Sequence, residues 1–316
     1  MPTYRRPPHL ERAVASVAAQ TMTAWELIIV DDNPPGSDAR RDTEAVADRL
    51  TSDSRIRYLR HGENRGGGAA RNTGIEAARS DVVAFLDDDD EWHPTKLDVQ
   101  LAALDAAAPT VAAVYCRIVV IEAETGSERL WPTGTSIPTT RQLLIRNTIG
   151  STSCIMCRRA ALVEIGLFDE TLPSRQDIDL YVRLSQRFTF VFVDAPLMTL
   201  HRHGEVSITS NYDGAVRAHE RFFEKYRSLI EADAEVLHAR LHDLGYVLFD
   251  AGRYEEARRV LVRAWRTRPT SRATIVRLAL TFALPRVAGR RAKQILQGLR
   301  RRRGAAPRVV KGHGRS

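Results

Sequence analysis

Helical and strand-like patterns of hydrophobic residues alternate along the first 121 residues of the chain. Apolar positions at helical spacing predict helices, and short apolar runs rich in β-branched residues are typical of buried strands. Strands that alternate with helices favour βαβ units and a mostly parallel sheet. The predicted helices are 10–20, 42–50 and 66–78, and the predicted strands are 25–30, 56–59 and 82–86.

The pattern changes between residues 110 and 200. A long strand at 111–121 is expected to pair with a short one at 129–131. A strand at 153–158, a helix at 176–187 and a strand at 189–193 follow. This order predicts an antiparallel extension that completes the sheet.

The chain beyond residue 211 is predicted to be helical. Residues 244–269 resemble one tetratricopeptide unit, and a single repeat cannot bury its own apolar face without neighbours. We therefore expect an α/β domain over 1–210, a helical appendage over 211–303 and a disordered basic tail over 304–316.

The first four residues read as the end of a strand whose apolar body is absent. Met1-Pro2-Thr3-Tyr4 would then follow an internal start or a truncation. Either would remove a central strand and lower the stability of the fold.

Four consecutive carboxylates, Asp87 to Asp90, come directly after the apolar run 82–86. They would lie at the carboxyl end of a strand, where open α/β sheets bind their ligands. Like charges there are unfavourable unless a cation offsets them, and hard divalent ions prefer oxygen ligands. A metal site is one interpretation of this run, and a solvated acidic turn is the other.

The composition is that of a core-forming globular protein, with 43% hydrophobic and 27% charged residues among 316. No apolar stretch approaches the ~20 residues that span a bilayer, and the N-terminus lacks a signal-peptide pattern. Three cysteines cannot form a disulfide framework, so we expect a reducing, cytoplasmic location. Cys154 and Cys157, which lie in a predicted strand, are interpreted as buried structural thiols.

The net charge of +8 is concentrated at the C-terminus. Residues 286–316 hold eleven basic side chains and no acidic one, whereas the rest carries 36 Lys and Arg against 39 Asp and Glu. Such a segment could lie on the cytoplasmic face of an anionic membrane or be a solubilising tail. Nucleic acid is not expected, because no aromatic residues interleave the charges.

An ordered set of motifs carries a specific resemblance. The motifs are Pro2-Thr3-Tyr4, Val30-Asp31-Asp32-Asn33, Asn64-Arg65-Gly66, Ala69-Ala70-Arg71-Asn72-x-Gly74-Ile75, Phe85-Leu86-Asp87-Asp88-Asp89-Asp90, Gly166-x-Phe168-Asp169-Glu170 and Gln176-Asp177-x-Asp179-Leu180. The segment 66–71 does not match a dinucleotide-binding fingerprint, because it lacks the last glycine. With these motifs, the chain over residues 1–205 resembles the family-two glycosyltransferases of GT-A fold, which implies a Rossmann-like mixed sheet flanked by helices.

The resemblance implies a nucleotide-sugar site, with a UDP-sugar favoured. Asp32 would bind the base or ribose, although a carboxylate there could instead serve a helix N-terminus. Thr3 and Tyr4 would line the same pocket, and Arg71 and Asn72 would contact base or phosphate. One departure is Arg5, where the family often has Asn, which puts the local turn geometry in question.

The resemblance also implies a divalent metal, Mg²⁺ or Mn²⁺, bound to the donor diphosphate. Asp87-x-Asp89 matches the family's DxD motif. Asp89 would bind the metal directly, whereas Asp87 would contact the ribose or a metal-bound water. Asp88 is assigned with Asp87 to the donor site, although a supporting role is the alternative. His203 is expected to join the metal.

Asp177 matches the catalytic base of inverting members of the family. A carboxylate must take the proton of the acceptor hydroxyl as it attacks, although an N-terminal helix charge is the alternative role. Asp179 is two residues further on and therefore faces a different direction.

These residues predict a metal-dependent inverting glycosyltransferase that acts on a glycan or lipid-linked acceptor, in glycan or glycolipid assembly. A non-catalytic module that binds a nucleotide-sugar or a partner is the alternative from another class. A nucleotidyltransferase that releases pyrophosphate is a third.

Overall fold

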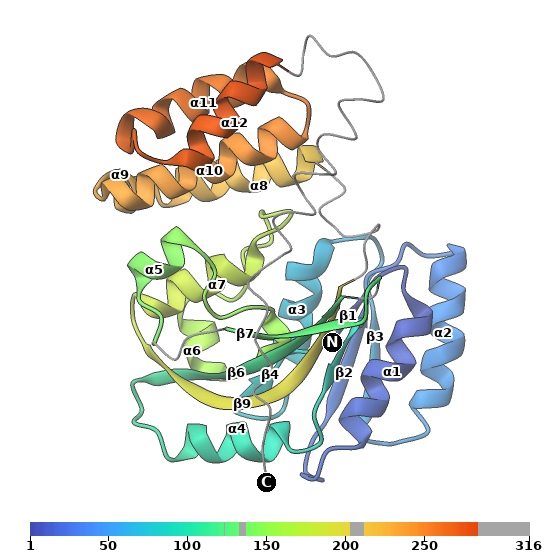
Figure 1. Cartoon of the computed structure of the whole chain (residues 1–316). Coiled ribbons are helices and arrows are strands. Elements are labelled where there is room, and N and C mark those ends of the chain that lie inside the picture. The colour runs from blue at the N-terminus through green and yellow to red at the C-terminus, as the bar shows by residue number, and fades with distance from the viewer. Residues whose placement is uncertain (123, 133–136, 203–211, 284–316) are drawn as a thin grey trace, which may run out of the picture. The chain divides into compact units, whose positions relative to one another are not determined.

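The computed structural model describes residues 1–122, 124–132, 137–202 and 212–283. The chain divides into two compact units, Met1–Val236 and Leu237–Ser316. Figure 1 labels the helices and strands of each unit.

A three-stranded parallel sheet opens the first unit. Its order is β1-β2-β3, and the helices between the strands make the connections that parallel pairing requires. The predicted βαβ organisation is confirmed. The elements are β1 (Pro2–Thr3), α1 (Pro7–Ala18), β2 (Leu27–Asp31), α2 (Asp38–Leu50), β3 (Ile56–Arg60) and α3 (Gly66–Ala77).

The second sheet has six strands in the order β4-β8-β6-β9-β5, with β7 paired to β6. The β6–β9 pair is parallel and the other pairs are antiparallel, so this sheet is mixed. The predicted pairing of 111–121 with 129–131 is confirmed by β6 and β7. Its strands are β4 (Val82–Ala84), β5 (Asp90–Trp92), β6 (Val111–Glu122), β7 (Ser127–Trp131), β8 (Ile155–Arg158) and β9 (Thr189–Arg202).

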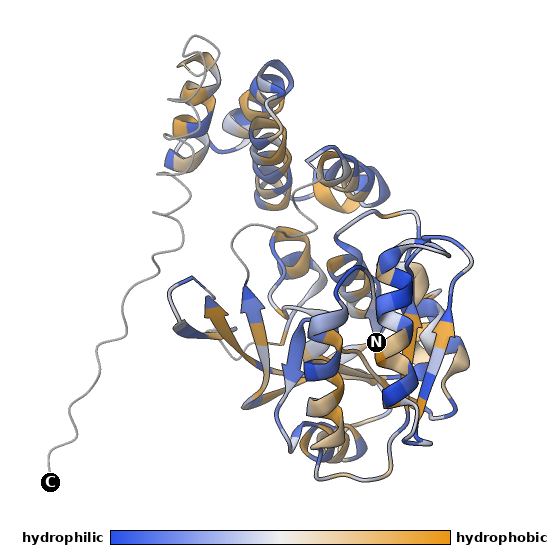
Figure 2. Ribbon diagram, turned by 90° about the vertical axis from the view of Figure 1, so that its right-hand side faces the viewer, coloured by the Kyte–Doolittle hydropathy of each residue, from blue (hydrophilic) through white to orange (hydrophobic). Residues whose placement is uncertain are grey.

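Helices cover the second sheet and bury its apolar strands. Helix α4 packs on β6 and β9, and α5 packs on α7. Figure 2 shows hydrophobic residues along the strands and polar residues on the outer sides of the helices. All three cysteines are buried and free, which confirms the predicted burial of Cys154 and Cys157. The helices are α4 (Lys96–Asp105), α5 (Thr140–Ile145), α6 (Arg159–Glu164) and α7 (Gln176–Ser185), with a 3₁₀ turn at Thr152–Cys154.

Two helices that follow β9 belong to the first unit. They are α8 (Tyr212–Lys225) and α9 (Arg227–Glu231). Lys225 and Tyr226 both contact the buried carboxylate of Asp179 on α7. The division between the units therefore falls after Val236 and not at residue 210, where the helical pattern begins.

The described part of the second unit is a group of helices. Gly245 of α10 lies so close to α11 that an added Cβ would be 2.6 Å from Leu261 Cγ. His238 Nδ1 lies 2.9 Å from the carbonyl of Ala264, so α10 and α11 pack antiparallel. This is the helix pair that the repeat-like segment 244–269 predicts. The helices are α10 (Ala234–Asp250), α11 (Tyr254–Thr267) and α12 (Arg272–Ala283).

Among the described residues, no helix is both long and apolar enough to cross a bilayer. The basic segment 286–316 lies outside the described residues. Its contact with an anionic membrane therefore stays a prediction.

Candidate active site

Thr3 forms hydrogen bonds with Asp32 and with Asp88, one from each acidic segment. The backbone N–H of Asp32 donates to the carbonyl of Thr3 at 3.0 Å. The Thr3 hydroxyl donates to the Asp88 carboxylate at 2.9 Å, and the N–H of Tyr4 donates to the same oxygen at 3.3 Å. The carboxyl end of β2 therefore lies close to the segment that follows β4.

Arg5, where the family often has Asn, lies in the turn after Tyr4. Arg5 has a φ of 58°, a left-handed conformation that Asn adopts more readily than most residues. The N–H of Arg5 donates to Asn33 at 2.9 Å. The arginine keeps the turn at some cost in strain, and its guanidinium lies 5.0 Å from the Tyr4 ring centroid.

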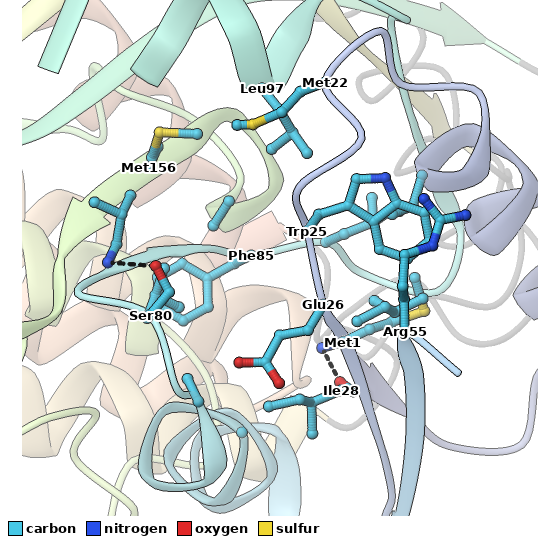
Figure 3. Close-up of a pocket in the computed structure, with 18 of the residues that line it drawn as sticks. Met1, Met22, Trp25, Glu26, Ile28, Arg55, Ser80, Phe85, Leu97 and Met156 are labelled. Atoms are coloured by element: carbon cyan, nitrogen blue, oxygen red, sulfur yellow. Dashed lines mark hydrogen bonds between the residues drawn. The ribbon is translucent and has the colours of Figure 1, made fainter. Parts of the chain in front are cut away.

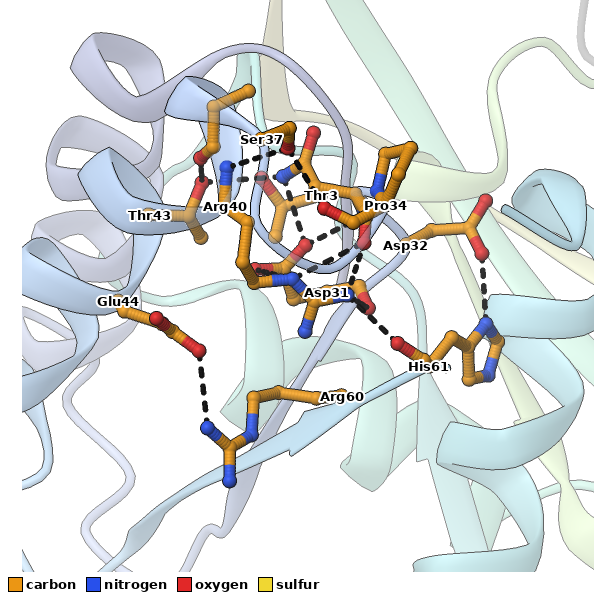
Figure 4. A network of polar contacts seen from close by, with 12 residues as sticks. Thr3, Asp31, Asp32, Pro34, Ser37, Arg40, Thr43, Glu44, Arg60 and His61 are labelled. Carbon is orange, nitrogen blue, oxygen red and sulfur yellow. Dashed lines mark hydrogen bonds and ion pairs between the residues drawn. The ribbon is translucent and has the colours of Figure 1, made fainter. Parts of the chain in front are cut away.

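The Asp32 carboxylate contacts the His61 ring (Figure 4) and the segment that opens α3. It is buried, it lies 2.7 Å from His61 Nδ1, and it accepts from the Asn64 amide at 2.8 Å. The backbone N–H groups of Arg65 and Gly66 also donate to it, each at 2.8 Å. This is the helix-terminus role that was the alternative for this residue. A direct contact of Asp32 with the donor stays a prediction.

Asp31, one residue earlier, is equally occupied. Its side chain accepts from the Tyr58 hydroxyl at 2.5 Å and from the N–H of Asn33 at 2.8 Å. The guanidinium of Arg40, also buried, donates to the carbonyls of Asn33 and His61 (Figure 4). This network holds the loop after β2 in one conformation.

The acidic run divides into two alternating pairs. Asp87 and Asp89 are partly exposed, and each forms an ion pair with an arginine. Asp88 and Asp90 are buried. Burial raises the pKa of Asp88 to about 7, and the negative charge of Asp89 is the second cause. Burial also raises the pKa of Asp90, which accepts from Ser151 at 3.3 Å.

Arginines from distant elements offset the negative charges of Asp87 and Asp89. Arg71 pairs with Asp87 and also donates to Gln176 at 3.3 Å, so it links the segment after β4 to α7. Arg6 pairs with Asp89, whose carbonyl accepts from Arg12 at 3.0 Å. Neither Arg6 nor Arg12 was predicted as a site residue from the sequence. Their position just after the Pro2-Thr3-Tyr4 motif is the only signal that could have indicated them.

The residues of this run fit a divalent cation. Its carboxylates are hard oxygen ligands, and the raised pKa values of Asp88 and Asp90 reflect burial and unbalanced negative charge. Within the described ranges no group of three or more His, Cys, Asp or Glu side chains could hold a metal. Mg²⁺ is usually bound by one or two carboxylates together with substrate phosphates. His203 lies outside the described residues.

Asp177 lies in the first turn of α7. The side-chain amide of Asn147 donates to its carboxylate at 2.8 Å. Burial raises the pKa of this carboxyl above its usual range, while the charges of Arg175 and Arg71 oppose the shift and that of Asp87 adds to it. The predicted base is therefore in the electrostatic environment of the Arg71–Asp87 pair.

Asp179 has a different environment, as its spacing predicts. Its side chain is fully buried and pairs with Arg183 at 2.8 Å and Lys225 at 2.7 Å. It also accepts from the Tyr226 hydroxyl at 2.7 Å. Asp179 anchors α7 and cannot reach a substrate without breaking these contacts.

Asn72 holds the loop that follows α6. Its amide donates to the carbonyl of Phe168 at 3.0 Å and to Glu170 at 2.8 Å, and its oxygen accepts from the N–H of Phe168 at 2.9 Å. Both amide hydrogens are therefore used within the protein. The predicted contact of Asn72 with the nucleotide-sugar donor stays a prediction. It would require Asn72 to exchange these hydrogen bonds for bonds to the donor.

Residues 1–166 match the family model described as glycosyl transferase family 2. The chain belongs to this family, and the protein is a glycosyltransferase. It is 33% identical over 217 residues to WcaA of Escherichia coli K12, named as a colanic acid biosynthesis glycosyl transferase, covering 67% of this chain and 74% of that protein. An uncharacterized glycosyltransferase of Rickettsia felis is 29% identical over 210 residues, which cover 65% of this chain and only 34% of that protein.

Solved structures show the same GT-A fold. TarS of S. aureus, residues 1–349 in complex with UDP-GlcNAc, aligns with a TM-score of 0.58 at 15% identity and covers 94% of this chain and 90% of that one. The mannosyltransferase PcManGT of Pyrobaculum calidifontis, in complex with GDP-Man and Mn²⁺, aligns with a TM-score of 0.55 at 17% identity, covering 97% and 79%. The predicted fold class is confirmed.

Proposed function

We propose that the protein is a metal-dependent, inverting glycosyltransferase that moves a sugar from a nucleotide-sugar to an acceptor hydroxyl. The observation that carries the proposal is that Arg71, which pairs with Asp87 after β4, also donates at 3.3 Å to Gln176, the neighbour of the candidate base Asp177. An inverting displacement needs one base and a site for the leaving diphosphate, and these two groups supply both.

The donor diphosphate would lie beside the exposed carboxylates of the acidic run. Asp89 would hold Mg²⁺ or Mn²⁺, which would neutralise charge on the departing nucleoside diphosphate, and Asp87 would contact the ribose or a metal-bound water. Arg71 and Arg6 would then exchange their ion pairs for phosphate oxygens, because guanidinium groups bind phosphates in two-point contacts. Thr3 and Asp88 would support the ribose side of this site.

Asp177 would accept the proton from the attacking hydroxyl. The acceptor oxygen forms a bond to the anomeric carbon as the bond to the diphosphate breaks, and the electron pair leaves with the diphosphate. The raised pKa of Asp177 suits this task, since a base with a higher pKa accepts a proton more readily. Asn147 keeps the carboxylate oriented.

The names and bound ligands of the relatives support the proposed substrates. TarS was solved with UDP-GlcNAc, which favours a UDP-sugar donor here. The name of WcaA refers to colanic acid biosynthesis, which supports an acceptor in a polysaccharide or lipid-linked glycan. A peripheral position on an anionic membrane would bring the protein to such an acceptor.

The test is release of nucleoside diphosphate from UDP-, GDP- and dTDP-sugars with Mn²⁺, Mg²⁺ or EDTA. We expect release from one donor class only with metal, and weaker Mn²⁺ binding in the presence of UDP for Asp89→Ala. Asp81→Ala is the control, because that carboxylate is exposed and precedes β4. Release that persists in EDTA would contradict the metal requirement, and pyrophosphate release would indicate nucleotidyl transfer instead.

A further inference from the structure

A polar cavity of about 360 Å³ lies in the first unit, where α8 faces the start of α3. Its volume is within the range of ligand pockets. It differs from a larger cavity of about 670 Å³, whose walls are mostly apolar and include Phe85 and Met156 (Figure 3). We call the smaller space the arginine cavity, because Arg65, Arg217 and Arg221 line it.

Helix α8 is fixed to the loop that forms one wall of the arginine cavity. Residues 170–173 of this loop line the cavity. Lys225 Nζ lies 2.6 Å from the Asp169 carboxylate, and the Arg221 guanidinium donates to the carbonyl of Thr171. The cavity is therefore formed by the packing of α8 on the rest of the first unit, which gives its arginines defined positions.

The arginine cavity carries unbalanced positive charge. Among the described residues that line it, Glu170 alone has a carboxylate, and this carboxylate lies 3.2 Å from Arg65. Glu170 also accepts from the Asn72 amide at 2.8 Å. In the part of the chain that the structure describes, neither Arg217 nor Arg221 forms an ion pair with a carboxylate. Two cationic charges of the cavity are thus not offset by the protein.

The two arginines of α8 lie on one face of the helix. Arg217 and Arg221 are four residues apart, a spacing at which like charges destabilise a helix. Both line the cavity. An anion bound between them would relieve this repulsion, and guanidinium groups bind phosphate and carboxylate oxygens in two-point contacts. The arrangement therefore favours an anionic ligand.

Gln176 connects the arginine cavity to the candidate active site. It lines the cavity, and its amide donates to the carbonyl of Leu172 at 2.7 Å. Its oxygen accepts at 3.3 Å from Arg71, which pairs with Asp87. The next residue of α7 is the candidate base, Asp177. The cavity thus borders the first turn of the helix that carries the base.

The arginine cavity is separate from the residues predicted to bind the nucleotide-sugar donor. The structure describes all of those residues, and they do not line the cavity. A transferase must bind its acceptor beside the base, so that the hydroxyl lies within hydrogen-bond reach of the carboxylate. A cavity that adjoins the base and lies apart from the donor residues meets this requirement for an acceptor.

We infer that the arginine cavity binds an anionic group of the acceptor, a phosphate or a carboxylate, and so selects acceptors that carry one. Arg217 and Arg221 would bind the anion while a hydroxyl of the same molecule reaches Asp177. The inference rests on the proposed transferase function, because it assigns the ligand of the cavity as the acceptor.

A pair of surface arginines that binds only water is the competing explanation. Arg217 and Arg221 are both exposed, which water alone would explain. It would not explain why Arg65, from the segment that opens α3, lines the same cavity as two arginines of α8. Three guanidinium groups from two segments around one carboxylate favour a bound anion.

The test is calorimetric binding of three probes to the full chain in the presence of UDP and Mn²⁺. The probes are a hexose 1-phosphate, the methyl glycoside of a hexuronic acid and the neutral methyl glycoside of a hexose. We expect at least one anionic probe to bind about tenfold more tightly than the neutral probe. Preference for the first probe would indicate a phosphate-bearing acceptor, and preference for the second a uronic acid.

The double variant Arg217→Ala, Arg221→Ala should bind the preferred anion about 10- to 100-fold more weakly, with unchanged affinity for UDP. The matched control is Arg259→Ala, Arg263→Ala, which removes the same charge at the same spacing from exposed positions of α11. Arg217→Ala alone should also weaken binding, and it leaves the contact of Arg221 with the loop in place. Arg221→Lys keeps the charge and should retain part of the affinity.

Equal affinity for anionic and neutral probes, or no measurable binding of any probe, would overturn the inference. Equal losses in the two double variants would also overturn it. These measurements need no turnover, so they are independent of the test of the transfer reaction. Arginine-dependent anion binding in a protein that releases no nucleoside diphosphate would contradict the proposed function and leave an anion site. Donor turnover without such binding would contradict the cavity assignment alone.

Discussion

The side-chain amide of Asn147 donates a hydrogen bond of 2.8 Å to the carboxylate of Asp177. The Asn147 oxygen accepts in turn from the N–H groups of Ile149 and Gly150, at 3.0 and 2.9 Å. The amide is therefore fixed by the loop before β8, and it fixes the orientation of the carboxylate in α7. No sequence pattern indicated Asn147, because it is 30 residues from its partner.

Asn147→Ala should move the acid limb of the pH–rate profile to higher pH. The hydrogen bond stabilises the ionised carboxylate, so its loss raises the pKa of Asp177 further. Nucleoside diphosphate release measured between pH 4 and 9 checks this. A lower rate with an unmoved acid limb would contradict it and indicate a purely structural role.

Asp177→Asn should stabilise the fold at neutral pH. The folded pKa of Asp177 is raised by burial, so its contribution to stability is present below the unfolded value of 3.8 and is lost as pH rises through the folded pKa. A neutral amide avoids this loss and can still accept from Asn147. Urea unfolding of both proteins at pH 4 and pH 8 measures the difference. A variant that is less stable than the parent at pH 8 would contradict the assignment.

Asp179→Asn should instead destabilise the fold. Its carboxylate is fully buried against Arg183 and Lys225, which are themselves partly exposed. Removing one partner of a buried ion pair is strongly unfavourable, and the exposure of the cations reduces the cost to about 2–3 kcal/mol. The urea midpoint reports the change, and Asp177→Asn is the matched control on the same helix. Equal shifts of the urea midpoint for the two substitutions would contradict the different roles of Asp177 and Asp179.

Asp32→Ala should also lower stability, because the carboxylate satisfies the backbone N–H groups of Arg65 and Gly66 at the start of α3. These partly buried donors would lose a capping acceptor, which costs about 0.5–2 kcal/mol. Asp38→Ala is the control, since that carboxylate is exposed in the first turn of α2. A normal unfolding midpoint for Asp32→Ala would show that the helix terminus does not depend on it.

Local patterns predicted the fold closely where one face of an element is buried. Strand β2, helix α7 and the β6–β7 pair follow from apolar runs and turn residues. Strand β5 was not predicted, because its residues Asp90–Trp92 belong to an acidic run and form a strand only by pairing with β9. The predicted strand at 189–193 continues to Arg202 for the same reason, since β6 supplies its partner along the whole length.

The sequence predicted which residues belong to the candidate site better than it predicted the role of each residue. The motifs predicted Asp32, Arg71, Asp87 and Asp177 as site residues. They could not show which of these side chains form hydrogen bonds or ion pairs within the protein. The structure uses Asp32 and Asn72 to hold loops, and it places arginines against Asp87 and Asp89. Such contacts join residues that are far apart in sequence, so no local pattern encodes them.

The most direct test of the account is donor turnover by Asp177→Asn, measured together with the affinity of the same variant for UDP and Mn²⁺. We predict that release of nucleoside diphosphate falls about 10²- to 10⁴-fold, as expected for the loss of a general base, while UDP affinity stays close to that of the parent. Turnover near the parent rate in a variant that still binds UDP would contradict the assignment of Asp177 as the base.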